Sequence, residues 1–256
     1  MNYMAENVSS SVLFHFTRSV DRLKGILENG FFPRYCLEYS LDPADRKAAS
    51  KRRPPMYAVP MVCFCDLPTS LIHKHLKAYG PYGIGLDKKW GLENGVAPVT
   101  YTHRRAQTRR PILRLTTKAV RTGDEKAADD LKVLAAYTKP FLGPQWREKA
   151  RPRFERDVAF YDEREWRYVP SVRGSDLFLS WKDYRDTARR RPLHKNLEKH
   201  ALLVQPEFIM YLILPEDTSE DNVVELHDYV MKRYSPRDAK LVTTTIMTVD
   251  RMEKDS

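Results

Sequence analysis

Residues 160–169 read FYDEREWRYV, and this stretch is the best guide to the fold. Its aromatic and β-branched residues favour a β-strand, which we expect to cover residues 154–169. Because successive side chains of a strand point to opposite faces, Glu163, Glu165 and Arg167 are predicted to share one face. A packed core does not accept two carboxylates that lack partners. The face that carries these acids is therefore either a solvated edge or a site built for chemistry.

Further strands and helices are predicted on both sides of this stretch. Apolar and β-branched runs predict strands at 12–17, 58–64, 82–86, 97–102, 208–214 and 241–249. Amphipathic spacing and capping residues predict helices at 20–29 after Ser19, at 70–78, at 180–190 and after Thr218, with two more inside 105–142 that divide near Gly123. The polar, proline-bearing residues 40–57 are predicted to form a loop. The pattern indicates an α+β fold in one domain, residues 1–256, in which 105–142 is a helical insertion.

Composition is typical of a soluble protein from a reducing compartment. Hydrophobic residues make up 42% of the 256, which is enough for a buried core, yet no stretch approaches the ~18 apolar residues of a membrane span. The first seven residues, MNYMAEN, lack the basic and apolar blocks of a signal peptide. The cysteines, Cys36, Cys63 and Cys65, are too few and odd in number for a disulfide framework. We therefore expect a cytoplasmic protein.

The charge balance favours an anionic partner. The chain has 44 Lys and Arg residues against 34 Asp and Glu residues, a formal net charge of +10, and nucleic acid is the commonest large anion. The positive charge is clustered at Lys51-Arg52-Arg53, at Arg104-Arg105 with Arg109-Arg110, and at Arg189-Arg190-Arg191. Each cluster alone is compatible with ordinary solvated surface, but together they favour a polyanion. Phosphate contacts of this kind carry no sequence readout.

The first predicted strand carries a candidate ligand-binding pair. His15 and Thr17 lie two residues apart and so point to one face, while Phe14 and Phe16 point to the opposite layer. Two hydrogen-bonding side chains on one surface can hold a ligand. The alternative is that His15 is a structural histidine near the core, and the residues themselves leave both alternatives open.

Two further motifs have ordinary explanations beside functional ones. Cys63 and Cys65 precede His73 and His75, but the two histidines are i,i+2 on a predicted helix and do not face together. Buried cysteines explain this segment better than zinc does, and no metal is expected. The segment 79–85, YGPYGIG, is not a phosphate-binding loop. It is either a turn or an aromatic surface whose glycines let a flat ring approach closely.

Several of these segments, in this order, resemble a known family. They are FHFT at 14–17 with the helix from Leu23 to Gly30, FCDLP at 64–68, YGPYGIGL at 79–86 with Pro98-Val99, and EREWR at 163–167. Together they are similar to the AbiGi family of bacterial abortive-infection, phage-resistance proteins. The resemblance covers most of the chain apart from 40–57 and 105–142. That family carries an antitoxin label, which implies binding more than catalysis.

The same order of motifs is similar to that of ADP-ribosyltransferases of the DarT and RNA 2'-phosphotransferase type. The resemblance implies their split β-sheet core with flanking helices. In that group a first-strand His-x-Thr holds NAD, a tyrosine stacks on the nicotinamide, and a late-strand glutamate completes the site. By this resemblance His15 and Thr17 would hold the NAD ribose and amide. Tyr82, or else Tyr79, would stack on the nicotinamide.

The resemblance also assigns roles to the acids of the opening stretch. Glu165 would be the catalytic acid, and Glu163 would face the acceptor. Breaking the nicotinamide–ribose bond develops positive charge on the ribose, which a neighbouring carboxylate stabilises. The chain departs from the group at Phe16, where many members have glycine. Other members use an arginine in the first motif, a role that is open to Arg18.

The leading expectation is an NAD-dependent ADP-ribosyltransferase toxin of a phage-defence system, with NAD as co-substrate and a cognate antitoxin protein as partner. The basic clusters favour nucleic acid as the acceptor, and RNA or single-stranded DNA in particular, because unpaired strands present a base without extrusion. The residues expected to contact it are Lys51, Arg52, Arg53, Arg104, Arg105, Arg109 and Arg110. The alternative is a non-enzymatic antitoxin or interaction module that binds a partner toxin or nucleic acid.

Overall fold

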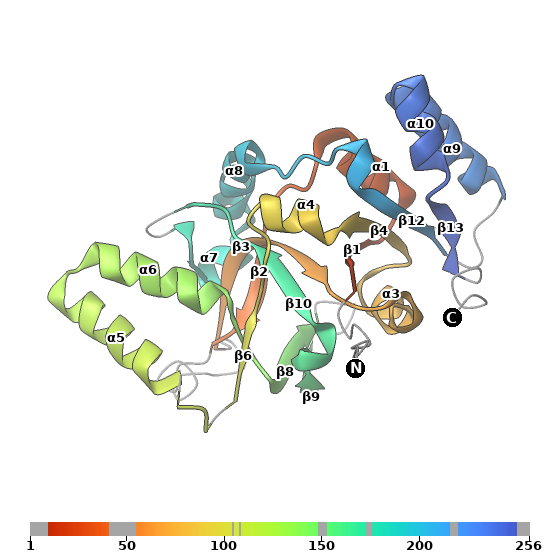
Figure 1. The fold of residues 1–256 in the computed structure, drawn as a ribbon. Coiled ribbons are helices and arrows are strands. Elements are labelled where there is room, and N and C mark those ends of the chain that lie inside the picture. Colours follow the sequence, from red (N-terminus) through yellow and green to blue (C-terminus); the bar gives the residue numbers. More distant parts are fainter. Residues whose placement is uncertain are drawn as a thin grey trace, which may run out of the picture. The chain divides into compact units, whose positions relative to one another are not determined.

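The computed structural model describes residues 10–40, 55–103, 105–107, 109–147, 153–172, 176–215 and 220–249. The chain falls into two compact units that alternate along the sequence. The first unit comprises Met1–Phe31, Cys63–Ala97 and Leu202–Ser256, and the second comprises Phe32–Val62 and Pro98–Ala201. Both units contain strands and helices, which confirms the α+β class (Figure 1). No helix in the described ranges is long and apolar enough to cross a membrane.

The first unit is built around strand β1 (Val12–Thr17). This strand pairs antiparallel with β4 (Tyr82–Asp87) on one side and with the end of β3 (Met56–Cys65) on the other. β4 pairs in turn with β12 (Ile209–Leu214), which runs parallel to β13 (Ile246–Thr248). The strands predicted at 12–17, 58–64, 82–86 and 208–214 are therefore confirmed, with small changes at their ends.

Helices and short turns complete the first unit. They are α1 (Val20–Asn29), η1 (Thr69–Leu71), α3 (His73–Tyr79), α4 (Lys88–Glu93), η5 (Pro206–Phe208), α9 (Glu220–Arg233) and α10 (Pro236–Thr243). Helix α1 begins as predicted, because the Ser19 hydroxyl accepts a hydrogen bond from the Arg22 N–H at 3.4 Å. It ends at Gly30, whose φ of 75° is left-handed and where a side chain would collide with the Leu202 carbonyl. A separate hydrophobic cluster of this unit, which contains no residue of α1, includes Val12, Phe14, Leu67, Ile72, Leu76 and Ile213.

The second unit contains the larger part of β3. Strand β2 (Arg34–Tyr39) and the short β11 (Leu179–Ser180) pair antiparallel with β3, and β10 (Glu165–Tyr168) lies between β3 and β5 (Ala97–Pro98). Two smaller pairs complete the strands: β6 (Thr100–Thr102) parallel to β7 (Thr138–Pro140), and β8 (Leu142–Arg147) antiparallel to β9 (Arg153–Ala159). Part of the core of this unit is formed by Tyr35, Ala58, Leu179 and Leu197.

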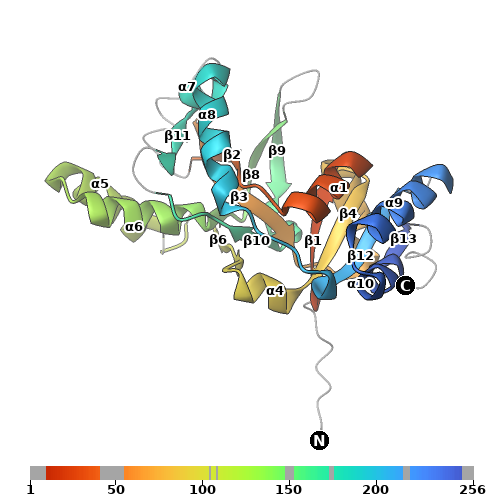
Figure 2. The same ribbon diagram turned by 90° about the horizontal axis from the view of Figure 1, so that it is seen from above.

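The predicted insertion at 105–142 forms a helical hairpin followed by a strand. Helices α5 (Arg109–Thr122) and α6 (Glu125–Ala136) lie side by side (Figure 1, Figure 2). Gly123 takes a φ of 70° between them, and the Asp124 carboxylate caps α6 by accepting from the Ala127 N–H at 3.0 Å. The two helices and their division near Gly123 are confirmed. Strand β7, which follows α6 directly, is not predicted by the helical spacing.

The predicted strand 154–169 is wrong in its middle. Strand β9 is followed by a 3-10 turn, η2 (Phe160–Glu163), and β10 starts only at Glu165. Arg164 between them has φ 43° and ψ 49°, a left-handed conformation that interrupts the strand. Glu163 therefore does not share a strand face with the acid two residues later.

Other predicted elements are divided or displaced. The expected strand 97–102 is two strands, β5 and β6, and the expected helix 180–190 is α7 (Trp181–Arg185) and α8 (Thr187–Leu197), followed by η4 (Glu198–His200). Asp186 separates the two helices because its carboxylate caps α8. The expected strand 241–249 is partly helix α10, which Ser235 caps, and only then β13. Residues 41–54 of the expected loop and the expected cap Thr218 lie outside the described residues.

Candidate functional site

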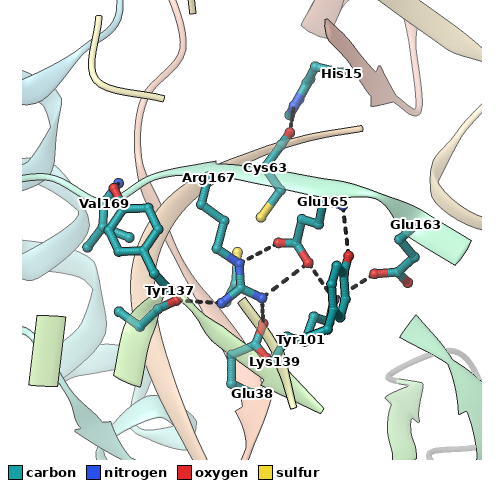
Figure 3. Close-up of polar contacts among 12 residues, drawn as sticks. His15, Glu38, Cys63, Tyr101, Tyr137, Lys139, Glu163, Glu165, Arg167 and Val169 are labelled. Carbon is teal, nitrogen blue, oxygen red and sulfur yellow. Dashed lines mark hydrogen bonds and ion pairs between the residues drawn. The ribbon is translucent and has the colours of Figure 1, made fainter. Parts of the chain in front are cut away.

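The second unit contains a cluster of five charged side chains. Its members are Glu38 on β2, Lys139 on β7, Glu163 at the end of η2, and Glu165 and Arg167 on β10 (Figure 3). We call this cluster the Glu165 network. Because its members are spread from position 38 to position 167, only the folded unit brings them together.

Arg167 is the fully buried centre of the network. It lies two residues after Glu165 on β10, so the two side chains share a face as predicted. Its Nε donates to Glu165 Oε1 at 2.6 Å and its Nη2 to Glu165 Oε2 at 3.2 Å, the forked geometry of a strong Arg–carboxylate pair. The guanidinium also donates to Glu38 Oε1 at 2.7 Å and to the Ala136 carbonyl at 2.6 Å. One arginine thus links β10 to β2 and to the end of α6.

Lys139 joins the two glutamates of the opening stretch. Its Nζ lies 2.6 Å from Glu163 Oε2 and 2.5 Å from Glu165 Oε2. The Lys139 side chain is 8% exposed, and its Nζ lies 4.6 Å from the centroid of the Phe160 ring, within the range of a cation–π contact. Glu163 and Glu165 are therefore brought together by a shared cation and not by a shared strand face.

Two tyrosines hold the backbone of β10. The Glu165 N–H donates to the Tyr101 hydroxyl at 2.8 Å, and the Val169 N–H donates to the Tyr137 hydroxyl at 3.2 Å. The Glu165 carbonyl accepts from the Val99 N–H at 3.0 Å. Glu165 is consequently fixed through its backbone as well as through its side chain.

The charges of the network determine its protonation. Burial disfavours the charged form of Glu165, but Arg167 and Lys139 outweigh it and hold the pKa of the Glu165 carboxyl well below its usual range. Burial also opposes the charge of Lys139, yet Glu165 and Glu163 outweigh it and raise the pKa of the ammonium group. For Glu38, burial outweighs the effect of Arg167 and raises the pKa of that carboxyl. Glu165 is thus ionised at neutral pH. Glu38 differs, because its burial favours the protonated form of the carboxyl.

This arrangement limits the chemistry that is open to Glu165. Both of its oxygens accept hydrogen bonds from cations, and the residue is only 6% exposed. Such a carboxylate is a poor general acid or base, because it has no proton to give and its cations disfavour the uptake of one. It can act as a fixed negative charge, either for the fold alone or for a positively charged group placed beside it.

His15 lies in the first unit, on β1. Its Nδ1 lies 2.8 Å from the Cys63 carbonyl oxygen, so this nitrogen carries the hydrogen and donates it (Figure 3). The ring contacts those of Phe31 and Phe64, whose centroids are 5.0 Å and 5.8 Å away. Burial lowers the pKa of His15, and the hydrogen bond to Cys63 opposes this only in part. These contacts favour a neutral histidine packed among aromatic rings.

The other predicted NAD-binding residues lie near the end of β1. Thr17 is buried and stands opposite Tyr82 in the β1–β4 ladder. Arg18 follows on the surface, and Tyr79 at the end of α3 is 37% exposed. A side chain on Gly80 would collide with the Thr17 carbonyl. The end of α3 therefore lies close to β1 and requires glycine at this position. The first unit thus gathers these candidates, while the predicted acids belong to the second unit.

The glycines of β4 allow the chain's own aromatic rings to pack closely. A Cβ atom built on Gly83 would lie 3.0 Å from the Phe16 ring, and one built on Gly85 would lie 2.8 Å from the Phe14 ring. The two phenylalanine rings stack with centroids 6.2 Å apart. On this face the space beside the glycines is therefore filled by Phe14 and Phe16.

Comparison with known proteins places the chain among phage-resistance proteins. A family model described as abortive phage resistance protein AbiGi, antitoxin, matches residues 29–215. The chain belongs to the AbiGi family. A curated relative, the abortive phage resistance protein AbiGi of Lactococcus lactis subsp. cremoris, is 30% identical over 170 residues, which cover 59% of this chain and 67% of the relative. No solved structure matches the chain.

The AbiGi match confirms the family predicted from the order of the motifs, and its bounds include some of the candidate residues and leave out others. The whole Glu165 network lies inside the matched range 29–215. His15, Phe16, Thr17 and Arg18 lie before it. The region that the AbiGi model describes therefore contains the predicted acids and not the predicted NAD-binding strand.

The structure of this AbiGi-family chain describes three of the seven basic residues that are predicted to contact nucleic acid. Lys51, Arg52, Arg53 and Arg104 lie outside the described residues. Arg105 and Arg110 are exposed, and Arg109 is the first residue of α5. Of the two exposed residues, Arg105 thus lies before α5 and Arg110 in its first turn.

Sequence reasoning does not find Glu38, Lys139 or Tyr101 in the AbiGi-family chain. One available signal for Lys139 is the segment 136–143, AYTKPFLG, in which a single lysine stands among apolar and aromatic residues. The segment 34–39, RYCLEY, sets Glu38 in a similar context. A lone charge in an apolar strand is a reason to expect a buried ionic partner.

Proposed function

We propose that this chain is the antitoxin of an abortive-infection phage-defence system and acts in the cytoplasm by binding its cognate toxin, not by catalysis. The observation that carries the proposal is that Lys139 and Arg167 engage both carboxylate oxygens of Glu165 inside the second unit. The description of the AbiGi family as an antitoxin supports the same function. In this proposal the Glu165 network is structural and fixes β10 and η2 for partner binding.

The proposal is tested by bacterial growth. Expression of the chain alone is expected to be harmless, and co-expression is expected to restore growth to cells that carry a toxin encoded beside its gene. Glu165→Gln is the informative variant, because Lys139 keeps Glu163 and Arg167 keeps Glu38, so each cation retains a carboxylate. The folded variant is expected to protect as well as the wild type. Toxicity of the wild-type chain that this substitution abolishes would contradict the proposal.

A second candidate function is NAD-dependent ADP-ribosyl transfer to RNA or single-stranded DNA, on a fold of the ADP-ribosyltransferase type. The observation that favours it is that Arg167 and Lys139 hold Glu165 ionised. A carboxylate beside the ribose must be charged to stabilise the positive charge that develops there. The other roles are those that the resemblance implies: His15 and Thr17 for NAD, Tyr82 for the nicotinamide, and Glu163 for the acceptor.

The enzyme candidate is tested by incubating the chain with labelled NAD and separate pools of RNA, DNA and protein. It requires label in a nucleic-acid pool and loss of that label in Glu165→Gln. The matched control is Glu93→Gln on α4, which changes an exposed carboxylate and is expected to leave labelling unchanged. Folded wild-type protein that labels none of the three pools would remove this candidate and leave the antitoxin proposal standing.

A further inference from the structure

Helix α5 carries a row of positive charge that the antitoxin function does not require. Arg110, Arg114, Lys118 and Arg121 are all exposed. Their spacings of four, four and three residues put them on one face of the helix. At 1.5 Å per residue the row is about 16 Å long. We call it the α5 stripe.

The opposite face of α5 fixes the stripe on the outside of the hairpin. Helix α5 packs along α6 (Figure 2), and on the side away from the stripe Ala119 is buried while Ile112 and Thr116 are half-buried. Rotating α5 to cover its cations would expose these residues. The outward position of the stripe is therefore a consequence of packing.

The stripe is electrostatically unfavourable for α5 itself. Neighbouring cations follow one another at i,i+4 and i,i+3, spacings at which like charges destabilise a helix. The helix has no acidic residue, and Arg109 and Arg110 stand at its N-terminus, where the helix dipole disfavours cations. Within the described part of the chain, no ion pair joins the four stripe residues to a carboxylate. A bound polyanion would relieve this repulsion.

We propose that the α5 stripe binds the phosphodiester backbone of nucleic acid without reading its sequence. A straight row of cations suits a linear chain of regularly spaced charges, and three of the four are arginines, which donate to phosphate in forked pairs. Helix α5 contains no aromatic residue that could stack on a base or anchor a protein interface. Of the residues predicted to contact nucleic acid, Arg110 is the first member of this row. The proposal does not depend on the antitoxin function.

The experiment is fluorescence anisotropy on the full chain with four labelled probes. The probes are duplex RNA, single-stranded RNA, duplex DNA and a poly-glutamate peptide, titrated at salt from about 50 to 200 mM. The double variant R114Q/K118Q removes two charges from the centre of the stripe, and glutamine keeps nearly the same helix propensity. The matched control R237Q/K240Q removes two exposed charges from α10.

The expected result distinguishes binding at the α5 stripe from binding that depends only on the net charge of the protein. R114Q/K118Q is expected to weaken nucleic-acid binding about tenfold at low salt and to reduce the slope of log affinity against log salt by about 2, one for each phosphate contact. R237Q/K240Q is expected to bind like the wild type. Because the substitutions at 114 and 118 remove like-charge repulsion, that variant is expected to melt no lower than the wild type.

Three outcomes would overturn the proposal. Unchanged binding by R114Q/K118Q would show that the α5 stripe is not the binding site. Equal losses of affinity in both double variants would show that binding depends only on the net charge of the protein. Poly-glutamate binding as tight as that of the nucleic acids would reassign the stripe to an acidic protein. Binding of RNA alone, DNA alone or both, with loss only in the stripe variant, would support it and identify the nucleic acid.

Discussion

The Nζ atom of Lys139 lies 2.5 Å from Oε2 of Glu165, a residue 26 positions further along the chain. The same ammonium group lies 2.6 Å from Glu163, on the other side of the left-handed Arg164. One lysine, supplied by the strand after the helical hairpin, thus pairs with both acids of the opening stretch. Lysine is seldom buried without partners, so the lysine and the two acids depend on one another.

Lys139→Met is expected to lower the free energy of unfolding by about 3–5 kcal/mol, the usual cost of removing one partner from a buried ion pair. Methionine fills a similar volume but leaves Glu163 and Glu165 without this cation. Urea denaturation followed by circular dichroism measures the change.

The control for this prediction is Lys89→Met, which removes a cation from the exposed pair with Glu93, where the atoms are 3.8 Å apart. An exposed pair of this kind contributes at most about 1 kcal/mol. Equal losses in the two variants would mean that burial of Lys139 adds nothing to its pairing.

The pairing of Glu165 with Arg167 could be predicted from the sequence, but the cation between the two glutamates could not. Residues at i,i+2 on a strand share a face whatever the tertiary structure, so the composition of 160–169 is sufficient for that pair. Lys139 reaches Glu165 only because β7 pairs with β6, and β7 is three residues long beside a region of helical spacing. Such a contact depends on tertiary placement, which local pattern does not contain.

The fold could be predicted where the hydrophobic spacing of a segment and the capping residues at its ends indicate the same element. Helix α1 has both amphipathic spacing and the Ser19 cap, and it begins where the sequence predicts. The predictions fail where a backbone feature outweighs composition. The left-handed Arg164 interrupts a segment rich in strand formers, and Ser235 with Pro236 starts a helix ahead of a Thr- and Val-rich segment. Intrinsic propensity is a weak guide when such a feature is present.

Glu165 is expected to make the protein less stable in acid. Its pKa is lower in the folded state than in the unfolded state, so the unfolded state binds more protons and stability rises with pH. The contribution is complete above the usual glutamate pKa of about 4.3 and is lost as pH falls towards the folded value. In urea denaturation, the stability of the wild type relative to Glu165→Gln is therefore expected to shrink below about pH 4.3. A difference that stays constant with pH would show that Glu165 is not held ionised.

Glu38 is expected to act with the opposite sign. Burial raises the pKa of its carboxyl, so the folded state binds more protons than the unfolded state and stability falls as pH rises through the folded pKa. Glu38→Gln imitates the protonated acid, and Arg167 keeps Glu165 as a partner. The variant is expected to gain stability relative to the wild type as pH increases, in the same urea experiment. Parallel curves for Glu38→Gln and Glu165→Gln would refute the assignment of opposite shifts.

His15 is expected to contribute stability that is lost on mild acidification. Burial lowers its pKa in the folded state, so the unfolded state binds more protons below the usual value of about 6.5. The stability is complete above that value and falls as pH decreases through it. His15→Asn keeps an N–H donor for the Cys63 carbonyl but does not titrate, so its thermal stability is expected to vary less between about pH 7 and 5.

The control for the histidine prediction is His227→Asn on α9, whose side chain is 51% exposed. This variant is expected to keep the pH dependence of the wild type. If His15→Asn and His227→Asn follow the same curve, His15 is not the residue that resists protonation in the folded protein.

Arg164 is expected to tolerate asparagine or glycine but not valine. Its φ of 43° and ψ of 49° lie in the left-handed region, which glycine and asparagine enter readily and which β-branched residues avoid. All three substitutions remove the arginine side chain, so Arg164→Asn is the matched control for Arg164→Val. The valine variant is expected to be less stable than the asparagine variant by about 1–3 kcal/mol in urea denaturation. Equal stability would mean that the turn accepts another backbone conformation, and that the left-handed residue is not what holds Glu163 against Lys139.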